Sequence, residues 1–362
     1  MTYRSVYLFI AACVACLITC LTPYNCIAQN TPRRALLALS KADHILAIID
    51  PVTFKVMARI PVGPDPHEVV ASTDGNFAYV SNMGGGNLHE LDVIDLTAQT
   101  ALPNFNTGPL IGLHGLDYKN GKLWFTAEGA KAIGRYDPKT ATVDWIMGTG
   151  QNRTHMIHVT SDEKQIYTTN VESGTVSIFE SVVMTPMPPP GGGMPQGGMP
   201  PRGGTPPPGM QPHAQWMQTL IPVSRGSEGF DVSPDGRELW TAAADDGKVS
   251  VIDIGSKKLA TTIDAQATGA NRLQFTPDGK RVFISSLRTG DLFIYDASTR
   301  REITRMNVGH GAAGILMDPD GERAFVACTG DNDIVVIDLK TLKITGHIDL
   351  GGPDGMAWAK KP

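Results

Sequence analysis

The chain has 362 residues, of which 41% are hydrophobic and 19% are charged, the balance of a globular protein with an apolar core. Its formal net charge is −5 and it contains no long basic run, so no nucleic-acid partner is expected. This length accommodates one large domain or two ordinary ones.

The first residues have the pattern of an export signal. Arg4 is the only charge before an apolar run, Val6–Leu21, and the small-residue stretch Cys26–Ala28 follows it. Because the run is shorter than the roughly 20 residues that usually span a bilayer, we expect no stable membrane span after cleavage. We predict a signal peptide over residues 1–28, cleavage before Gln29, and a periplasmic or extracellular protein.

Two alternatives remain for this segment. It could be a retained membrane anchor, or it could be lipidated, because Ile10–Cys13 looks like a lipoprotein cleavage box. That box lies so close to the N-terminus that the apolar region before it would be short. Cysteine usage agrees with a cleaved leader, because four of the five cysteines fall within it. Cys328 would then be the only cysteine of the mature chain, which leaves no intramolecular disulfide. We expect it to be a small buried hydrophobe in a strand.

A short signature recurs along the rest of the chain: an apolar strand that ends in an acid. Its acids are Asp50, Asp95, Asp137, Glu180, Asp253, Asp296 and Asp338. Successive acids lie 42 to 45 residues apart, except between Glu180 and Asp253, where the interval is 73. A repeat of this period indicates stacked structural units, and the long interval indicates an insertion within one of them.

Each unit contains four strand-like segments separated by polar turns. Turns such as "SPDG" (Ser233–Gly236) combine a proline that presets its backbone angle with a glycine that accepts positive φ. No helical period is present between Thr31 and Pro362. Four antiparallel strands in about 43 residues make one blade of a β-propeller, so the chain is predicted to be all-β.

Two segments carry a resemblance to a known family. "AYVSN" (Ala78–Asn82) and "YTTN" (Tyr167–Asn170) resemble the YVTN-type β-propeller repeat family. The resemblance covers essentially the whole mature chain and implies a propeller fold. Members of that family are largely uncharacterised or associated with cell surfaces, so the resemblance says little about chemistry.

Seven innermost strands are predicted, and they start near His67, His114, His155, Glu228, Asn271, Ala313 and Gly355. The last of them, "GMAWA", has no outer strands after it, whereas three strands without partners open the mature chain. We predict a single seven-bladed propeller over residues 33–362, in which the N-terminal strands and the C-terminal strand complete the last blade. Such closure removes the open sheet edges.

The loops that lead into the innermost strands place one residue per blade at the mouth of the central channel. These mouth residues are His67, His114, His155, Glu228, Asn271, Ala313 and Asp354. The loops after the second strands open on the same face and add Glu128 and Arg288. We predict a polar ligand pocket formed by His67, His114, His155, Glu228, Asn271, Asp354, Glu128 and Arg288.

Three consecutive blades supply histidine at the mouth and the next supplies glutamate. Imidazole nitrogens and a carboxylate oxygen suit borderline divalent ions, so His67, His114, His155 and Glu228 are candidate metal ligands. The candidate ions are Zn²⁺, Cu²⁺ or Fe²⁺, with Ca²⁺ as a further option. The alternative is that these loops are polar only because they face a water-filled channel.

The long interval contains a segment rich in proline, glycine and methionine. Met184–Met210 has ten prolines, eight glycines, five methionines and one charge, Arg202. We predict a disordered insertion over residues 182–215, in the hairpin between the third and fourth strands of one blade, on the face opposite the mouth. It could be a passive insertion, an adhesive loop or, with His213, a Cu(I) site.

The sequence constrains the function of the protein less than it constrains the fold. The chain has no GxSxG elbow, no glycine-rich phosphate loop and no CxxCH heme attachment motif, and no residue is assigned a catalytic role. We expect an exported, monomeric binding or scaffold propeller that presents the mouth to a small ligand, a metal or a protein partner. The alternative is an enzyme: a metal-dependent lactonase-like hydrolase or an oxidoreductase-associated propeller, as in other seven-bladed proteins.

Overall fold

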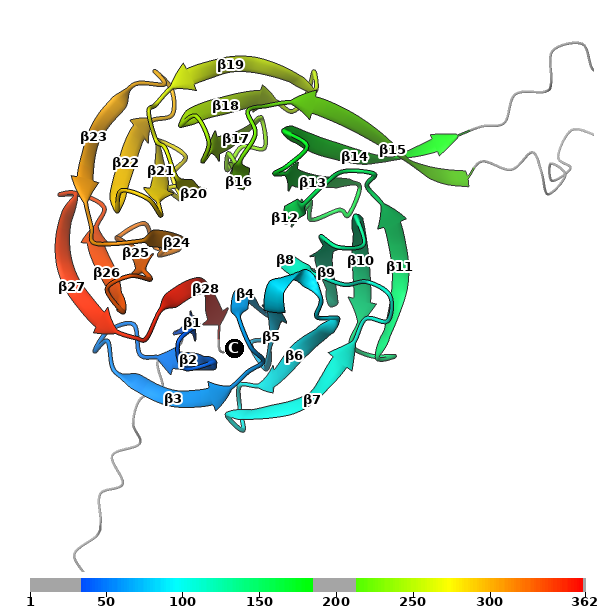
Figure 1. The fold of residues 1–362 in the computed structure, drawn as a ribbon, viewed down its shortest axis with the longest axis horizontal. Helices are drawn as coiled ribbons and strands as arrows, with labels where there is room; N and C mark the ends of the chain where they lie inside the picture. The colour runs from blue at the N-terminus through cyan, green and yellow to red at the C-terminus, as the bar shows by residue number, and fades with distance from the viewer. Residues whose placement is uncertain (1–33, 185–212, 361–362) are drawn as a thin grey trace, which may run out of the picture. The chain divides into compact units, whose positions relative to one another are not determined.

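The computed structural model describes residues 34–184 and 213–360; the predicted signal peptide and most of the predicted insertion lie outside them. The described strands form seven four-stranded antiparallel sheets. These sheets are arranged as blades around a central channel, with one innermost strand of each blade facing the axis (Figure 1). The prediction of an all-β, seven-bladed propeller is confirmed.

Six blades each consist of four consecutive strands, of which the first is the innermost and the last the outermost. Blade 1 contains β4 (Pro66–Ala71), β5 (Phe77–Asn82), β6 (Glu90–Asp95) and β7 (Thr100–Asn106). Blade 2 contains β8 (Leu113–Lys119), β9 (Lys122–Ala127), β10 (Ala132–Asp137) and β11 (Thr142–Gly148). Blade 3 contains β12 (Thr154–Val159), β13 (Gln165–Asn170), β14 (Thr175–Met184) and β15 (His213–Pro222).

The next three blades repeat this order. Blade 4 contains β16 (Ser227–Val232), β17 (Glu238–Ala243), β18 (Lys248–Asp253) and β19 (Lys258–Asp264). Blade 5 contains β20 (Ala270–Phe275), β21 (Arg281–Ser286), β22 (Asp291–Asp296) and β23 (Glu302–Asn307). Blade 6 contains β24 (Ala312–Met317), β25 (Arg323–Cys328), β26 (Asp333–Asp338) and β27 (Lys343–Asp349).

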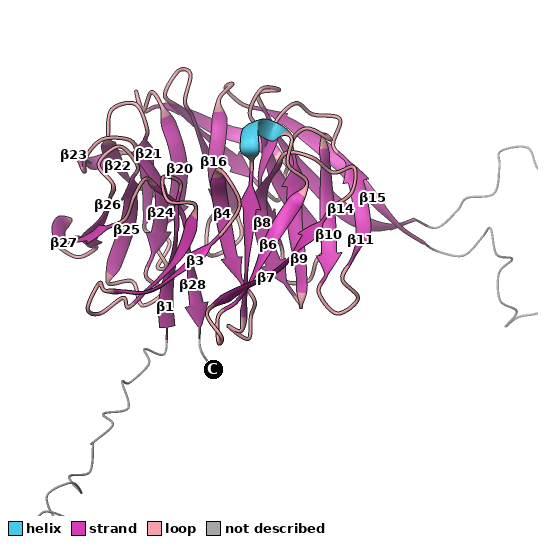
Figure 2. Ribbon diagram, turned by 60° about the horizontal axis from the view of Figure 1, so that its bottom comes forward, coloured by secondary structure: helices cyan, strands magenta, loops and turns pink. Residues whose placement is uncertain are grey.

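Blade 7 joins the two ends of the described chain. Its order is β28 (Pro353–Lys360), β1 (Arg34–Ser40), β2 (Ile45–Ile49) and β3 (Val56–Pro61). Strand β1 pairs antiparallel with β28, from Arg34 opposite Lys360 to Ser40 opposite Pro353. The predicted closure of the ring by N-terminal strands is therefore confirmed, and the start of β1 lies beside the end of β28 on the face opposite the mouth (Figure 2).

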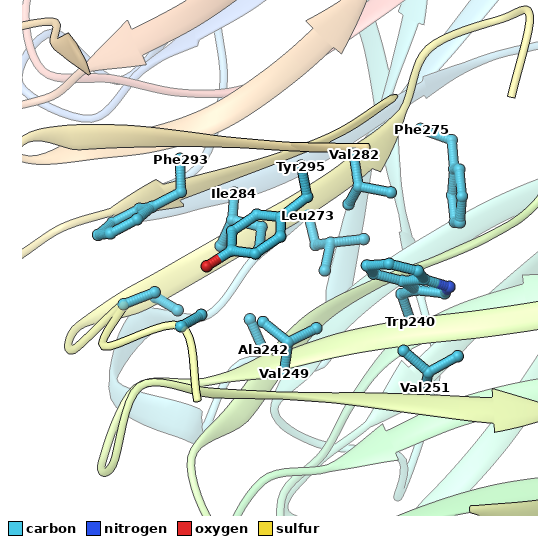
Figure 3. Packing of buried hydrophobic residues seen from close by; sticks show 13 residues of the cluster. Trp240, Ala242, Val249, Val251, Leu273, Phe275, Val282, Ile284, Phe293 and Tyr295 are labelled. Atoms are coloured by element: carbon cyan, nitrogen blue, oxygen red, sulfur yellow. The ribbon is translucent and has the colours of Figure 1, made fainter. Parts of the chain in front are cut away.

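The apolar core is divided among the contacts between blades. Seven clusters of buried residues occur in the described chain, one at each interface between neighbouring blades. Strand β1 shows why: Leu36 packs toward blade 6, whereas its neighbour Leu37 packs toward blade 1, since alternate side chains of a strand face opposite sides. Figure 3 shows the cluster between blades 4 and 5, where Trp240 meets Phe275 edge to face.

The hairpin β14–β15 carries the predicted insertion and projects beyond its blade (Figure 1). The ladder between its strands is continuous from Thr175 opposite Pro222 to Met184 opposite His213. Strand pairing thus extends three residues into each end of the predicted range 182–215, and residues 185–212 lie outside the described structure.

Two local features lie outside the repeated pattern of strands. The residues after β5 form a short 3₁₀ helix, η1 (Gly84–Gly86), which marks the mouth face in Figure 2. Cys328 on β25 is a free, buried cysteine, and burial raises the pKa of its thiol to about 12. No helix within residues 34–184 and 213–360 has both the length and the apolar character needed to cross a bilayer.

Candidate functional site at the channel mouth

An irregular register turns one side chain per blade into the channel. In blade 1, Pro66 pairs with Asn82, and the ladder resumes at Glu68 opposite Ser81, which leaves His67 unpaired. The same interruption occurs next to the mouth residue in each of the other six innermost pairs. A β-bulge bends its strand and redirects a side chain, so the repeated bulge explains why these residues converge on the axis.

All seven mouth residues line one cavity of about 200 Å³ at the end of the channel. Five further residues complete its wall: Lys41, Arg153, Arg272, Leu287 and Thr329. Every blade therefore contributes to the cavity. Its lining combines imidazole, carboxylate, amide, ammonium and guanidinium groups with the apolar side chains of Ala313 and Leu287.

The three histidines lie next to one another on blades 1 to 3. His114 Nε2 lies 3.0 Å from His67 Nδ1, and the tilted rings of His114 and His155 have centroids 3.7 Å apart. The side chains of His114 and His155 are 1% and 2% exposed. Burial lowers the pKa of both imidazoles well below the usual value, and nearby Arg272 and Arg153 act in the same direction. Both rings are therefore neutral at physiological pH.

Glu128 extends the histidine row on the outer side of His155. It follows β9, and its carboxylate bonds to His155 Nδ1. Burial raises the pKa of Glu128 to about 7; Arg153, whose Nε lies 3.7 Å away, counters part of this rise, whereas Glu228 adds to it. Burial thus favours the uncharged forms of both Glu128 and His155.

His67 lies within a second polar group at the other end of the row. Its Nε2 is 3.0 Å from Asp65 Oδ1 and 2.9 Å from Lys41 Nζ. Lys41 also donates to Asp354 Oδ2 at 2.9 Å. Burial lowers the pKa of His67, while the carboxylates of Asp354 and Asp65 oppose that shift.

Glu228 has hydrogen-bond donors at both of its oxygens. Arg153 Nη2 donates to Oε1 at 2.9 Å, and Asn271 Nδ2 donates to Oε2 at 2.7 Å. Its carboxylate therefore links blades 3, 4 and 5. A ligand that uses Glu228 must displace one of these donors.

The position one residue deeper in each innermost strand sets the floor. Four blades have glycine at this position: Gly115, Gly229, Gly314 and Gly355. A Cβ on any of these glycines would lie less than 3.0 Å from the carbonyl oxygen of the mouth residue in the next blade. Blades 1 and 5 instead have Glu68 and Arg272, which form an ion pair across the channel. Because Arg272 also lines the cavity, this pair limits its depth.

Hydroxyl groups on the second strands hold neighbouring blades in place at this level. Thr126 Oγ1 on blade 2 accepts the N–H of Gly115 at 2.8 Å and donates to the carbonyl oxygen of His155 on blade 3 at 2.6 Å. The equivalent hydroxyls of Ser81, Thr169 and Ser285 donate to the carbonyls of His114, Glu228 and Ala313. The backbones of these four mouth residues are thus fixed from the preceding blade.

The structure brings most of the predicted pocket together. Six of its eight residues line the cavity: His67, His114, His155, Glu228, Asn271 and Asp354. Glu128 contacts His155 beside it, whereas Arg288 is exposed and its neighbour Leu287 lines the cavity instead. That these residues bind a ligand or a metal stays a prediction.

Sequence reasoning missed Lys41, Thr329 and Arg272. Lys41 and Thr329 occupy the first position after the second strand of their blades, the position that Glu128 and Leu287 occupy in theirs. Aligning that single position across all seven blades would have found them. Arg272 could have been found because its position is glycine in four blades, so that a long charged side chain there is unusual.

Comparisons with known proteins add fold relationships. A family model, the cytochrome D1 heme domain, matches residues 203–322, about a third of the chain. No curated protein matches the sequence. Among solved structures, a putative 6-phosphogluconolactonase from Bacteroides fragilis is 14% identical, with a TM-score of 0.66 over 91% of this chain and 99% of that one.

Two other solved structures are similar over most of the chain. Hydrazine synthase from Kuenenia stuttgartiensis is 14% identical, with a TM-score of 0.62 over 81% of this chain and 89% of that one. The dihydro-heme d1 dehydrogenase NirN, solved in complex with DHE, is also 14% identical, with a TM-score of 0.58 over 89% and 74%. At such low identity these likenesses establish the propeller fold and leave the chemistry of the mouth to its own residues.

Proposed function

We propose that this chain is an exported, monomeric β-propeller of the YVTN type that binds a small polar ligand in the cavity at the channel mouth. The observation that carries the proposal is the convergence of all seven mouth residues on one cavity with a polar lining. A concave site with a few converging polar groups is the usual form of a ligand site.

The size and charge of the cavity restrict the class of ligand that it can bind. Its volume of about 200 Å³ lies below the roughly 300–1,000 Å³ of sites for drug-sized ligands. Lys41, Arg153 and Arg272 offer N–H donors, and Asp354 and Glu228 offer acceptors. We therefore expect a compact molecule with both acceptor and donor groups, such as a small hydroxy acid or amino acid.

The cavity is smaller than the usual site for a drug-sized ligand, so we do not propose that it encloses heme d1. A tetrapyrrole is larger than most drug-sized ligands, so it needs more space than the mouth offers. The ion pair between Glu68 and Arg272 also blocks extension of the site down the channel. The partial match to the cytochrome D1 heme domain therefore does not lead us to propose a tetrapyrrole here.

A binding test can use a variant that fills the empty space. Ala313 lines the cavity, so Ala313→Leu reduces its volume without removing a polar group. We expect a screen of small polar acids by thermal shift and calorimetry to find a ligand for the wild type that Ala313→Leu does not bind. Ala98→Leu, on an exposed turn, is the matched control. Equal binding by wild type and Ala313→Leu would contradict the proposal.

A second candidate, hydrolysis of a small ester or lactone, is favoured by one observation. His155 is neutral, lines the cavity and is oriented through Nδ1 by Glu128, the arrangement of a base with its orienting carboxylate. Hydrolysis of lactones or p-nitrophenyl acetate that disappears in His155→Ala and persists in Ala98→Leu would support it. Equal rates in His155→Ala would exclude this role.

A further inference from the structure

The histidines of the mouth form a hydrogen-bonded row that begins at Asp65. His67 Nε2 lies 3.0 Å from Asp65 Oδ1, and His67 Nδ1 lies 3.0 Å from His114 Nε2. A neutral imidazole has one N–H donor and one acceptor nitrogen. If His67 donates to Asp65, it accepts from His114 Nε2–H, and His114 Nδ1 is left with a free lone pair.

The opposite order of donors is less favourable. It requires Lys41 to donate to His67 Nε2 and places an N–H on His114 Nδ1. Among the described residues that nitrogen has no hydrogen-bond partner, and the His114 side chain is 1% exposed. A buried N–H without an acceptor costs about 1–3 kcal/mol. The row from Asp65 leaves His114 Nδ1 unprotonated, as a buried acceptor that also lacks a partner, and a metal ion could supply that partner.

Two further side chains with metal-binding atoms lie near His114. The ligand atoms that His114, Glu128 and His155 can offer all lie within 4.8 Å of one another. They come from two adjacent blades, on β8, after β9 and on β12, which the Thr126 hydroxyl joins. His155 is 2% exposed and the side chain of Glu128 is 8% exposed, so water has little access to the cluster.

We propose that His114, His155 and Glu128 bind one divalent transition-metal ion, with His67 and Asp65 as positioning residues for His114. Two imidazoles and one carboxylate with an open fourth position form a known class of Zn²⁺ site, and Cu²⁺ binds such donors more tightly. Two of the three ligands, His114 and His155, also line the cavity. This inference rests on the proposed function only in that both sites lie at the channel mouth. The ion can bind without a small ligand.

The charges around the cluster favour a divalent cation. The ion pairs of the mouth contain five carboxyl groups but three fixed cations, Lys41, Arg153 and Arg272. The carboxyl groups are Asp65, Glu68, Glu128, Glu228 and Asp354. With all five ionised, the mouth has two more negative than positive charges; without an ion, burial reduces this excess by favouring the uncharged form of Glu128, and a 2+ ion would offset it with Glu128 ionised.

Ion binding predicts a specific rearrangement. The rings of His114 and His155 are tilted relative to each other, with planes 30° apart. The lone pair of an imidazole nitrogen lies in the plane of its ring, so at least one of the two rings must turn for both lone pairs to point at one ion. The ion also replaces the direct bond between His155 Nδ1 and Glu128.

The test is a titration of the purified full chain, after treatment with EDTA, with Zn²⁺ and with Co²⁺ as a spectroscopic probe. We expect one ion per chain and visible Co²⁺ bands of a low-coordinate site. Both should be lost in His114→Ala and in Glu128→Gln, which keeps the shape of the side chain. His347→Ala is the matched control, because His347 also pairs with a carboxylate, Asp333, but on the outer strand of blade 6.

The positioning role of Asp65 has its own readout. Asp65→Asn should weaken Zn²⁺ binding roughly 10–100-fold and shift the Co²⁺ bands, with an unchanged thermal midpoint in EDTA. No ion bound by the wild type, or unchanged affinity in a folded Glu128→Gln, would overturn the metal site. Small-ligand binding is measured separately, in EDTA. If the protein binds a small ligand but no ion, this inference alone is wrong. If it binds an ion but no small ligand, the proposed function alone is wrong.

Discussion

The hydroxyl of Thr126 donates a hydrogen bond of 2.6 Å to the carbonyl oxygen of His155 in the next blade. The same hydroxyl accepts the N–H of Gly115 in its own blade. Because both strands are buried at this level, one side chain fixes the spacing between two innermost strands and, with it, the position of an imidazole at the mouth. The fold and the candidate site thus depend on the same contact.

Removing this hydroxyl should therefore destabilise the protein. Thr126→Val keeps the shape of the side chain but leaves a buried N–H and carbonyl without this partner, which costs about 1–3 kcal/mol. Urea unfolding measures the change, and Thr126→Ser, which keeps the hydroxyl, is the control. Equal losses of stability in both variants would show that the methyl group matters rather than the hydrogen bond.

The glycine beside this hydroxyl makes a sharper steric prediction. A Cβ on Gly115 would come under 3.0 Å from the carbonyl oxygen of His155, so Gly115→Ala must push blades 2 and 3 apart. We expect the free energy of unfolding to fall by about 1–3 kcal/mol, as for other overpacked interiors. Gly148→Ala, where a Cβ meets no atom within 4 Å, should change stability by less than about 1 kcal/mol. Similar unfolding midpoints for the two variants would contradict this steric role of Gly115.

Such contacts mark the limit of what the sequence predicts. The seven blades follow from the repeated acid-ended strands and their turns, and closure by β1 follows from counting strands without partners. The mouth residues were predicted by aligning the loops that lead into the innermost strands, and the structure adds that a bulge next to each residue turns it toward the axis. Local spacing cannot predict the pairing of Glu68 with Arg272, because it joins residues of non-adjacent blades across the channel.

The other misses have similar causes. The side chain of Lys41 reaches His67 and Asp354 only after blade 7 has closed, so its role depends on a contact between the two ends of the chain. Arg288 was predicted one position too far along its loop, since the residue that faces the cavity is Leu287. Strands β14 and β15 extend past the predicted bounds of the insertion because their ladder continues to Met184 and His213.

A partly buried carboxyl group away from the mouth predicts a pH dependence of stability. Asp231 on β16 accepts the N–H of Phe275 in blade 5 at 2.8 Å, and burial raises its pKa to about 7. The unfolded value is near 3.9. Because the folded state binds the proton more tightly, the Asp231 contribution to the free energy of unfolding falls as pH rises from about 4 to 7.

The variant Asp231→Asn isolates this contribution, since it removes the titration and keeps an acceptor oxygen. We expect the difference in the free energy of unfolding, variant minus wild type, to be more positive at pH 8 than at pH 5 in urea titrations. Other titrating groups cancel in this difference. A difference independent of pH would show that Asp231 ionises in the folded protein as it does in the unfolded chain.

Closure of the ring predicts that the N-terminal strands are essential. Strands β1, β2 and β3 supply three of the four strands of blade 7, and Leu37 and Leu39 of β1 are fully buried against blade 1. A chain that lacks residues 33–60 should expose the interfaces of blades 1 and 6, and lose its cooperative thermal transition and monomeric elution. A chain that lacks only residues 1–28 is the control and should keep both.

The hairpin that carries the insertion should be separable from the rest of the molecule. Met184 and His213 are the last paired residues of β14 and β15, so an Asn-Gly turn can replace residues 185–212 and close a standard hairpin. The hairpin lies at the outer edge of blade 3, whereas the cavity lies on the channel axis (Figure 1). We therefore expect the shortened chain to keep the thermal midpoint of the wild type and its Zn²⁺ affinity.

The same shortened chain distinguishes the roles left open for the methionines. Thioethers bind Cu(I), a soft ion, whereas the imidazole and carboxylate donors of the mouth suit Zn²⁺ and Cu²⁺. If the methionines form a separate copper site, the shortened chain loses Cu(I) binding and keeps Zn²⁺ binding, while Glu128→Gln shows the opposite pattern. Loss of Zn²⁺ binding in the shortened chain would contradict the assignment of the ion to His114, His155 and Glu128, because none of them lies on β14 or β15.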